Sequence, residues 1–458
     1  MRCCELKTGQ IADFIVRTTY EQLPEQAIRN AKKAILDCVG VTLAGSREDA
    51  GRIITTYVKD LGGKPVASVI GGGFRTSAVH AALANGTMAH ALEYDDYVLE
   101  TAFHPSVAVL PAVLALGEEC KVSGREILLA YVVGHEVGSK ICRVIGSKHY
   151  ERGWHATPIV GTMGAAAASA KILKLDQHQT KMALGIAASQ VGGMRENFGS
   201  FTKAFHAGHA AKSGVMAGQL AQKGFTSSDR IIEGDFGFVK ILGEADRRDS
   251  VRSFDHLGSP YDIVSPGVTT KYYPCCACSH RAVDGLLQLV KEHGIHPEDI
   301  SEVLCKVSSL IPEKVMVYHR PKTAPEGKFS LEFCIAIACL DRELSLRQFT
   351  DEKVVSPKAQ ALMEKVKIVP VQGAGSIPEA IDLPEELTIK LKNGKTYECR
   401  VAVPKGDYRN PMSDEEVALK YRNCASFALP VKKIDNSLRR LKHLETLPKI
   451  AALMKTIR

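Results

Sequence analysis

Residues 161–172 read Gly161-Thr-Met-Gly-Ala-Ala-Ala-Ala-Ser-Ala-Lys-Ile172, and almost every side chain in this stretch is small. Small side chains let helix axes approach closely, so the stretch predicts a central helix packed against several others. Helical patterns surround it at residues 11–18, 24–43, 107–119, 124–144, 176–190 and 204–222, with another helix opening near Thr76 or Ser77. No convincing alternating strand occurs before about residue 265. The first part of the chain is therefore predicted to be a helical domain.

The pattern changes after Pro274. A helix is predicted from His280 to His293, and the alternation from Val303 to Leu310 is typical of a half-buried strand. Asn393-Gly394 separates two further alternating runs, and this dipeptide supplies the positive φ angles that a tight hairpin turn needs. Helices near 330–341 and 356–366 complete a predicted α+β domain.

The length of 458 residues exceeds what one hydrophobic core usually serves, so we expect two domains. Ser413 and Glu416 form a capping box that opens one more helix, and helical character continues to the end of the chain. The tail is therefore expected to return to the first domain. We predict a large all-α domain from residues 1–267 with 405–458, and a smaller α+β domain from residues 268–404.

The composition, 45% hydrophobic and 24% charged, is that of an ordinary soluble globular protein. The sequence contains no run of about 18 apolar residues and no apolar core of a signal peptide, so we expect a cytoplasmic or organelle-matrix location and no membrane partner. The formal charge of +8 is spread without a dense Lys/Arg run. This distribution argues against nucleic acid as a partner and is compatible with a small anionic substrate.

Thirteen cysteines are scattered along the chain, and their odd number and the chain's size favour mostly buried thiols over disulfides. Cys275 and Cys278 have the spacing that zinc prefers, and His280 lies close in sequence. Because no second pair occurs at a matching distance, we predict no metal, and zinc stays the less favoured alternative.

The stretch from Ala84 to Ser106 carries an acidic cluster, Glu93, Asp95 and Asp96, followed by His104 in front of Pro105. Acids and a histidine on one loop are suited to proton transfer. The alternative is a helix cap with a solvated loop, since Asp and Glu mostly face water.

Further candidates occur downstream, each with a structural alternative. His155 lies beside the only tryptophan and could instead be a core histidine. Lys203 stands at a predicted helix start, where backbone N–H groups favour anions, although surface lysines are common. Tyr318 and Arg320 offer a phenol and a guanidinium suited to a carboxylate, or belong to an ordinary surface loop.

The sequence has no Walker loop, no dinucleotide fingerprint opening a βαβ unit and no serine nucleophile elbow. What remains is a set of acids, histidines, lysines and a tyrosine without a cofactor signature. Such a set suits removal of a proton next to a carboxylate, with cations that bind the substrate and stabilise enolate-like charge.

Five stretches, in this order along nearly the whole chain, resemble the MmgE/PrpD family: 84–106, 153–157, 203–214, 271–280 and 318–330. That family includes 2-methylcitrate dehydratases, cis-aconitate decarboxylases and iminodisuccinate epimerases. The resemblance implies a cofactor-independent, homodimeric enzyme. It also implies a large helical domain built from both ends of the chain, a smaller α+β lid domain, and an active site between them.

The decarboxylase branch resembles this chain at His104, His155, Lys203, Lys271 and Tyr318. Glu93 stands where that branch has the first acid of an Asp-Phe-Asp-Asp run, and Cys276 stands where it has a histidine. The loop from Glu93 to His104 is one residue longer, which is closer to the epimerases. The resemblance thus implies catalytic roles for His104, His155, Lys203, Glu93, Asp95, Asp96 and Tyr318, and substrate binding by Lys271, Cys276 and Arg320.

We therefore predict a lyase, a dehydratase or decarboxylase, that acts on a small di- or tricarboxylic acid by acid/base proton transfer. The alternative is an epimerase of an amino- or iminodicarboxylate. A non-catalytic scaffold that retained the fold and a zinc enzyme are the two remaining hypotheses.

Overall fold

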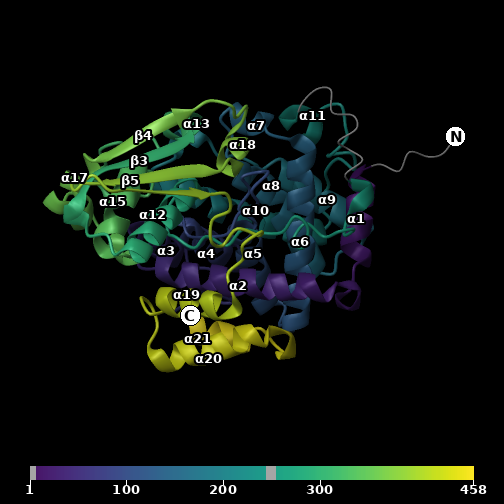
Figure 1. The fold of residues 1–458 in the computed structure, drawn as a ribbon. Coiled ribbons are helices and arrows are strands. Elements are labelled where there is room, and N and C mark those ends of the chain that lie inside the picture. Colours follow the sequence, from purple (N-terminus) through teal and green to yellow (C-terminus); the bar gives the residue numbers. More distant parts are fainter. Residues whose placement is uncertain (1–6, 244–253) are drawn as a thin grey trace. The chain divides into compact units, whose positions relative to one another are not determined.

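The computed structural model describes residues 7–243 and 254–458 (Figure 1). The chain forms two compact units, Met1–Val268 with Ser413–Arg458, and Thr269–Met412. The boundaries predicted from the sequence were 267/268 and 404/405, against 268/269 and 412/413 in the structure. The C-terminal segment belongs to the first unit, which is where the sequence analysis expected the tail to return.

The first unit is built almost wholly of helices. Its longer ones are α1 (Lys7–Arg17), α2 (Glu25–Gly45), α3 (Asp49–Leu61), α4 (Ala78–His90), α5 (Pro105–Glu119), α6 (Gly124–Ile145), α8 (Ala156–Ile172), α9 (Gln177–Ala188), α10 (Phe201–Gln222), α19 (Asp414–Ala425), α20 (Val431–Lys442) and α21 (Ala451–Ile457). Helix α3 was not predicted from the sequence. Neither were the two-residue strands β1 (Ala67–Ser68) and β2 (Arg75–Thr76), which are too short to show an alternating pattern.

Helix α8 lies at the centre of this unit, as its small residues predicted. Every residue from Ala156 to Ala170 is buried. A Cβ added at Gly161 would lie 2.6 Å from Ala108 on α5, and one at Gly164 would lie 2.7 Å from the Gly134 carbonyl on α6. These separations are too short for real side-chain atoms, so glycine is what permits both helices to pack directly on α8.

Helices α4 and α10 cross with their backbones touching. A Cβ at Gly208 would lie 2.2 Å from the carbonyl oxygen of Leu83, and one at Gly86 would lie 2.8 Å from the Gly208 Cα. Helix α4 ends at His90, and α10 carries Lys203 in its first turn. The crossing therefore fixes two elements that carry site residues.

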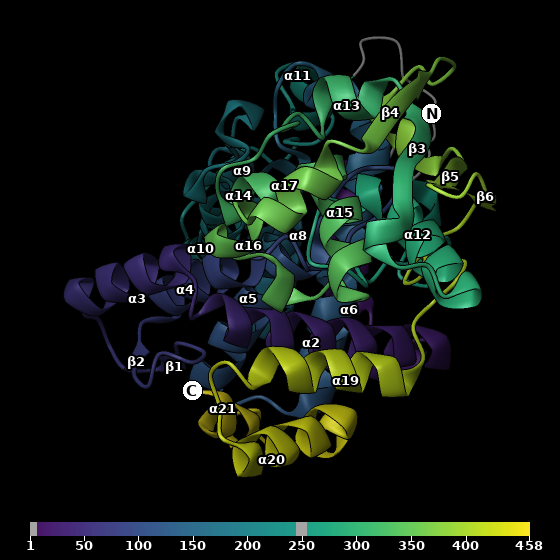
Figure 2. The same cartoon turned by 60° about the vertical axis from the view of Figure 1, so that its left-hand side comes forward.

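The C-terminal segment packs on α2. Figure 2 shows α19 running beside α2, with α20 and α21 beyond it. Ser413 caps α19 and completes the predicted capping box with Glu416. An exposed ion pair joins the two helices between Lys33 and Asp414 at 2.7 Å.

The second unit holds a four-stranded mixed sheet in the order β4-β3-β5-β6. Its strands are β3 (Ile300–Ser308), β4 (Val366–Val371), β5 (Glu385–Leu391) and β6 (Thr396–Val401). Strand β4 pairs with β3 in parallel, and the other pairs are antiparallel. Helices α12 (His280–His293), α15 (Leu331–Asp341) and α17 (Pro357–Met363) pack with this sheet or with one another (Figure 1).

The hairpin of β5 and β6 was predicted, and Gly394 in its turn has the positive φ of 85° that the turn requires. Strand β4 was not predicted. It carries Pro370, which disfavours interior strands, and its place at the sheet edge explains why the proline is tolerated. The mostly helical fold with a small mixed sheet agrees with the predicted class.

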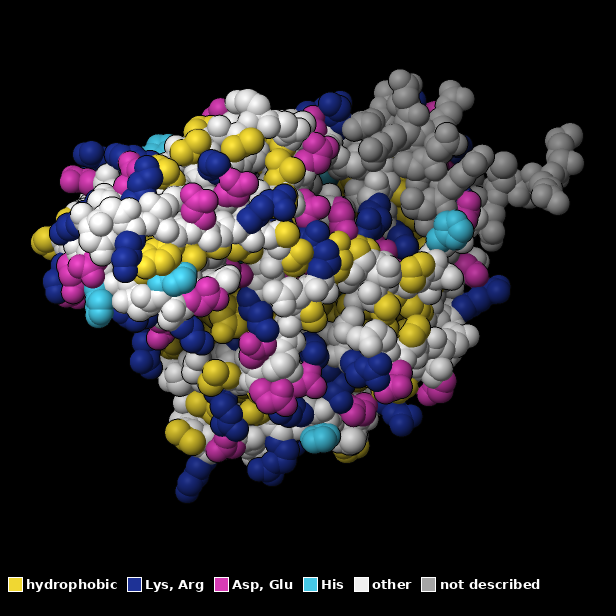
Figure 3. Space-filling view, viewed as in Figure 1, with side chains coloured by type: hydrophobic (Ala, Val, Ile, Leu, Met, Phe, Trp, Pro, Cys, Tyr) yellow, Lys and Arg dark blue, Asp and Glu magenta, His cyan; other side chains and the backbone are white. Residues whose placement is uncertain are grey.

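None of the helices in the described ranges is both long enough and apolar enough to cross a bilayer. On the face drawn in Figure 3, Lys and Arg side chains are intermixed with Asp and Glu, in keeping with the even spread of charge along the sequence.

Candidate functional site

The loop between α4 and α5 carries the acidic cluster and is buried. Residues 92–99 are all inaccessible to solvent or nearly so, and Asp95 is 0% exposed. The backbone N–H of Val98 donates to the Phe103 carbonyl at 2.8 Å and closes the loop on itself. The alternative of a solvated loop is therefore wrong.

Asp95 binds two imidazoles through one oxygen. Its Oδ2 lies 2.7 Å from Nδ1 of His104 and 3.0 Å from Nδ1 of His90. Burial alone would raise the pKa of Asp95, but the two imidazoles outweigh it and hold that pKa well below its ordinary value. Because an ionised carboxylate only accepts hydrogen bonds, both Nδ1 atoms carry a proton.

Helix boundaries place these two histidines. His90 is the last residue of α4, whereas His104 is the N-cap residue of α5, whose first helical position is Pro105. Proline suits that position because its φ is already helical and it has no N–H to satisfy. The loop therefore ends at His104 and α5 begins at Pro105, which fixes the position of His104 at the helix start.

His155 is the N-cap residue of α8, and its backbone N–H donates to the Gly193 carbonyl at 2.9 Å. Its ring stacks on that of His90, with centroids 5.7 Å apart, and its Nδ1 lies 3.2 Å from Nδ1 of His206. Burial, followed by the charges of His90 and Lys203, holds the pKa of His155 well below its ordinary value. His155 is buried, as a core histidine would be, but its ring contacts the other histidines of the cluster, and its catalytic role stays a prediction.

His206 was missed by the sequence analysis. The same causes, burial first, lower its pKa to about 4, so two neutral rings share the contact between His155 and His206, and one Nδ1–H donates to the other. The signal was present in the sequence, because His206 follows Lys203 by three residues and shares its helix face.

Lys203 forms a buried ion pair with Glu93. The ammonium also lies 4.9 Å from the ring centroid of Phe198, and the edge of the same ring meets His155 at a centroid distance of 4.9 Å. The lysine, the glutamate and the histidines therefore belong to one cluster in the first unit. Glu93 has a positive φ of 55°, which a residue with a Cβ rarely adopts and which surrounding contacts must maintain.

Asp96 contacts the start of α5. The backbone N–H of Ser106 donates to its Oδ1 at 3.2 Å, and the hydroxyl of Ser106 donates to its Oδ2 and lies 2.6 Å from the Tyr131 hydroxyl. Burial raises the pKa of Asp96 to about 8, despite the opposing hydrogen bond from Ser106. The group is therefore largely protonated near pH 7 and supports the helix that carries His104.

Three helix N-termini meet at this cluster. The backbone N–H of His104 donates to the Thr157 hydroxyl at 3.3 Å, which ties the start of α5 to the start of α8, and Lys203 sits in the first turn of α10. Helix N-termini carry partial positive charge. They favour negative charge, and the cluster already holds the Asp95 carboxylate and the Glu93 carboxylate, the latter paired with Lys203.

His90, Asp95 and His104 could also hold a metal ion, since they offer three ligand atoms within 4.8 Å of one another. No other such group occurs among the described residues. In the second unit, Sγ of Cys275 lies 3.1 Å from the Ser279 hydroxyl, and within the described part of the chain Cys275 and Cys278 do not join a third ligand in this way. All eleven described cysteines are free thiols, and eight of them are buried.

The other predicted residues lie in the second unit. The backbone N–H of Cys276 donates to the Lys328 carbonyl at 3.0 Å, and that of Tyr318 donates to the neighbouring Phe329 carbonyl at 3.4 Å, so both flank one short segment. Lys271 is only 3% exposed, whereas Arg320 is exposed. That these four residues act with those of the first unit stays a prediction.

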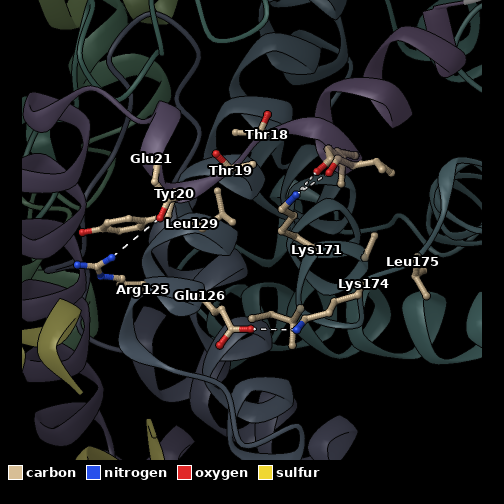
Figure 4. Close-up of a pocket in the computed structure, with 14 residues that line it drawn as sticks. Thr18, Thr19, Tyr20, Glu21, Arg125, Glu126, Leu129, Lys171, Lys174 and Leu175 are labelled. Carbon is tan, nitrogen blue, oxygen red and sulfur yellow. Dashed lines mark hydrogen bonds and ion pairs between the residues drawn. The ribbon is translucent and has the colours of Figure 1, made fainter. Parts of the chain in front are cut away.

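A separate cavity of about 500 Å³ lies at α1, α6 and α8 (Figure 4). Lys171 projects into it and donates to the carbonyls of Ile15 and Val16 at 2.8 and 2.9 Å, and Lys174 pairs with Glu126 at 3.3 Å. None of the predicted site residues lines this cavity, and these charged groups bind the protein itself.

Two family models match this chain. The model of the MmgE/PrpD N-terminal domain matches residues 9–249, and that of the MmgE/PrpD C-terminal domain matches residues 273–443. The chain belongs to the MmgE/PrpD family. Its histidine cluster lies in the region matched by the N-terminal model, and the predicted residues of the second unit, except Lys271, lie in the region matched by the C-terminal model.

Relatives in the MmgE/PrpD family are similar to nearly the whole chain. The cis-aconitate decarboxylase of Mus musculus is 29% identical over 98% of this chain and 93% of that protein, and that of Homo sapiens is 28% identical over 94% and 90%. The cis-aconitate decarboxylase of Aspergillus terreus is 26% identical over 98% and 95%. The family and these relatives indicate an enzyme of the lyase class.

Proposed function

We propose that this MmgE/PrpD protein is a cofactor-independent lyase that acts on a small di- or tricarboxylic acid by proton transfer next to a carboxylate. The observation that carries the proposal is the Asp95–His104 hydrogen bond of 2.7 Å, which joins a buried carboxylate to a partly exposed imidazole in the same cluster as the Lys203–Glu93 ion pair. An oriented imidazole and a cation are the two groups that such chemistry requires.

In this proposal His104 exchanges the proton. Asp95 holds Nδ1 of His104, fixes the tautomer and stabilises the imidazolium that forms when Nε2 takes a proton. Lys203 stabilises the negative charge that develops on the carboxylate next to the reacting carbon. In this proposal His155, whose Nδ1 contacts His206 and whose ring stacks on that of His90, is a second proton-transfer group.

The two lyase reactions use this machinery in different directions. In decarboxylation a C–C bond breaks, carbon dioxide leaves, and the electron pair remains on a carbon that then takes one proton from an imidazolium. In dehydration a base removes one proton from the carbon, and hydroxide leaves as water after receiving a proton. The names of the relatives support decarboxylation of an unsaturated tricarboxylate as the first reaction to test.

An epimerase of an amino- or iminodicarboxylate is the second candidate. The loop from Glu93 to His104 resembles the epimerases in length, and Cys276 replaces a histidine of the decarboxylases. Epimerisation needs two proton-transfer groups on opposite faces of one carbon, which His104 and His155 would supply.

The test is a panel of cis-aconitate, hydroxylated tricarboxylates and iminodicarboxylates, incubated with the wild-type protein and followed by proton NMR and mass spectrometry in light and heavy water. Loss of carbon dioxide or water supports the lyase. Deuterium incorporation at unchanged composition supports the epimerase. No conversion of any substrate by the folded protein would contradict both and favour the scaffold hypothesis.

Metal independence is tested in the same assay. Elemental analysis of the purified protein should find no stoichiometric zinc, and incubation with a chelator should leave the activity unchanged. Zinc near one equivalent, with activity lost on chelation, would support the metal-enzyme alternative. His90, Asp95 and His104 would then be the candidate ligands. The proposed homodimer is tested by light scattering, which should give twice the mass of the chain.

A further inference from the structure

One ammonium group of the C-terminal segment reaches the loop that carries Asp95. Lys420, on α19, is 3% exposed at its side chain, and its Nζ lies 2.7 Å from Oδ1 of Asp37 on α2. The same Nζ donates to the backbone carbonyl of Tyr94 at 2.8 Å and lies 3.8 Å from the centroid of the Tyr94 ring. A single side chain therefore joins α2, α19 and the loop between α4 and α5.

The carbonyl that Lys420 binds belongs to the peptide bond between Tyr94 and Asp95. On the other side of Tyr94, Glu93 has the positive φ of 55° and pairs with Lys203. A backbone in this conformation costs free energy that the surroundings must offset. Two lysines thus hold two consecutive residues of the loop. Lys203 binds the side chain of Glu93, and Lys420 binds the backbone carbonyl of Tyr94.

Helix α19 itself has little freedom to shift. A Cβ added at Gly40 of α2 would lie 3.1 Å from the Tyr421 ring and 3.2 Å from its Cα, so the two helices approach closely beside Lys420. Tyr421 is 0% exposed, and its hydroxyl lies within hydrogen-bond distance of Ser437 on α20. Because α19 is tightly packed, the position of the Lys420 ammonium is fixed by the position of the helix.

We propose that Lys420 is a positioning residue that sets the place of Asp95, and through it the orientation of His104, in the reaction proposed above. The inference rests on the proposed function for its kinetic consequences. The C-terminal segment then contributes to proton transfer and not only to the stability of the helical unit.

The alternative is that Lys420 and Asp37 form a buried ion pair that serves stability alone. Removing one partner of such a pair leaves an uncompensated buried charge, so Lys420→Met by itself would confound the two roles. The double variant Lys420→Met/Asp37→Asn removes both charges together with the donor to Tyr94. Asp37→Asn alone keeps the ammonium and its bond to the Tyr94 carbonyl but leaves that buried charge without its carboxylate, so it measures the effect of breaking the ion pair while the contact with the loop remains. The control Lys33→Met removes a different ion pair between α2 and α19, the exposed one with Asp414.

With a substrate that the wild-type protein converts, we expect the double variant to lower kcat about 10- to 100-fold, because a displacement of about 1 Å from productive geometry costs on the order of 100-fold. KM should change less than about threefold, since Lys420 does not bind substrate in this proposal, and the pH profile of kcat should shift. Asp37→Asn and Lys33→Met should both stay within about threefold of wild type. A double variant with wild-type kcat and pH profile would overturn the inference and leave the proposed function standing.

A second measurement does not depend on turnover. Amide hydrogen exchange of peptides covering residues 91–104 should be faster in the double variant than in Asp37→Asn, whereas peptides from α6 should exchange equally in both. Equal exchange of the loop in the two variants would contradict the inference, whether or not the wild-type protein converts a polycarboxylate. Absence of conversion by the wild-type protein would instead refute the proposed function.

Discussion

Asp95 and His104 are joined by a hydrogen bond of 2.7 Å between Oδ2 and Nδ1, and the same oxygen binds His90. The pair is separated by only nine positions in the chain, yet it spans the end of a buried loop and the first cap of α5. A buried carboxylate that orients an imidazole is the arrangement from which the proposed chemistry follows.

The first prediction concerns this pair. His104→Gln should lower kcat by about 10²- to 10⁴-fold, the usual contribution of a general acid or base, and Asp95→Asn by about 10²-fold or more, because the amide no longer fixes the tautomer. Steady-state kinetics measures both. His178→Gln, at an exposed histidine on α9, is the matched control and should be indistinguishable from wild type.

The second prediction concerns the Lys203–Glu93 ion pair. Lys203→Met should destabilise the protein by about 3 kcal/mol, because it leaves the Glu93 carboxylate buried without its cation. The double variant Lys203→Met/Glu93→Gln should recover most of that stability in urea denaturation. Its kcat/KM should nonetheless stay at least about 10²-fold below wild type. Recovered activity would show that Lys203 serves the fold only.

A third prediction follows from the low pKa of His206, about 4 in the native protein against 6.5 in an unfolded chain. The native state binds fewer protons at this site, so its contribution to stability is complete above about pH 6.5 and is lost as the pH falls towards 4. His206→Asn should therefore weaken the loss of stability between pH 7 and 5 by about 2 kcal/mol. Urea denaturation at several pH values tests this, and His178→Asn should keep the wild-type pH dependence.

The fourth prediction tests the crossing of α4 and α10. Gly208→Ala should destabilise the protein by about 2–3 kcal/mol, because its Cβ would meet the Leu83 carbonyl oxygen at 2.2 Å. It should also lower kcat, because the crossing places His90 and Lys203. The control Gly9→Ala lies in α1 with no atom within 4 Å of the added Cβ, and thermal unfolding should find it unchanged or up to about 1 kcal/mol more stable.

The fifth prediction concerns the second unit. If Lys271 binds a substrate carboxylate in the ground and transition states alike, Lys271→Ala should raise KM by about tenfold or more and lower kcat less. Lys291→Ala, on the last turn of α12, is the control and should leave both constants unchanged. An unchanged KM in Lys271→Ala would count against a carboxylate-binding role.

Local patterns in the sequence determined most of the helices, the Asn393-Gly394 hairpin, the capping box at Ser413 and the family, because periodicity, caps and turn residues act over a few positions. The motif positions also pointed to His104, His155 and Lys203. These local patterns did not predict strand β4 or helix α3. Parallel pairing of β4 with β3 joins segments about 60 residues apart and leaves no local mark.

Only the tertiary structure decided how the acidic cluster is divided. Glu93, Asp95 and Asp96 are equivalent as sequence symbols, but the fold directs Glu93 to Lys203, Asp95 to the two imidazoles and Asp96 to the start of α5. It also brought in His90, His206 and Lys420. Those assignments depend on close helix packing between distant segments, and the direction in which a buried side chain points is fixed by that packing and not by its neighbours in the chain.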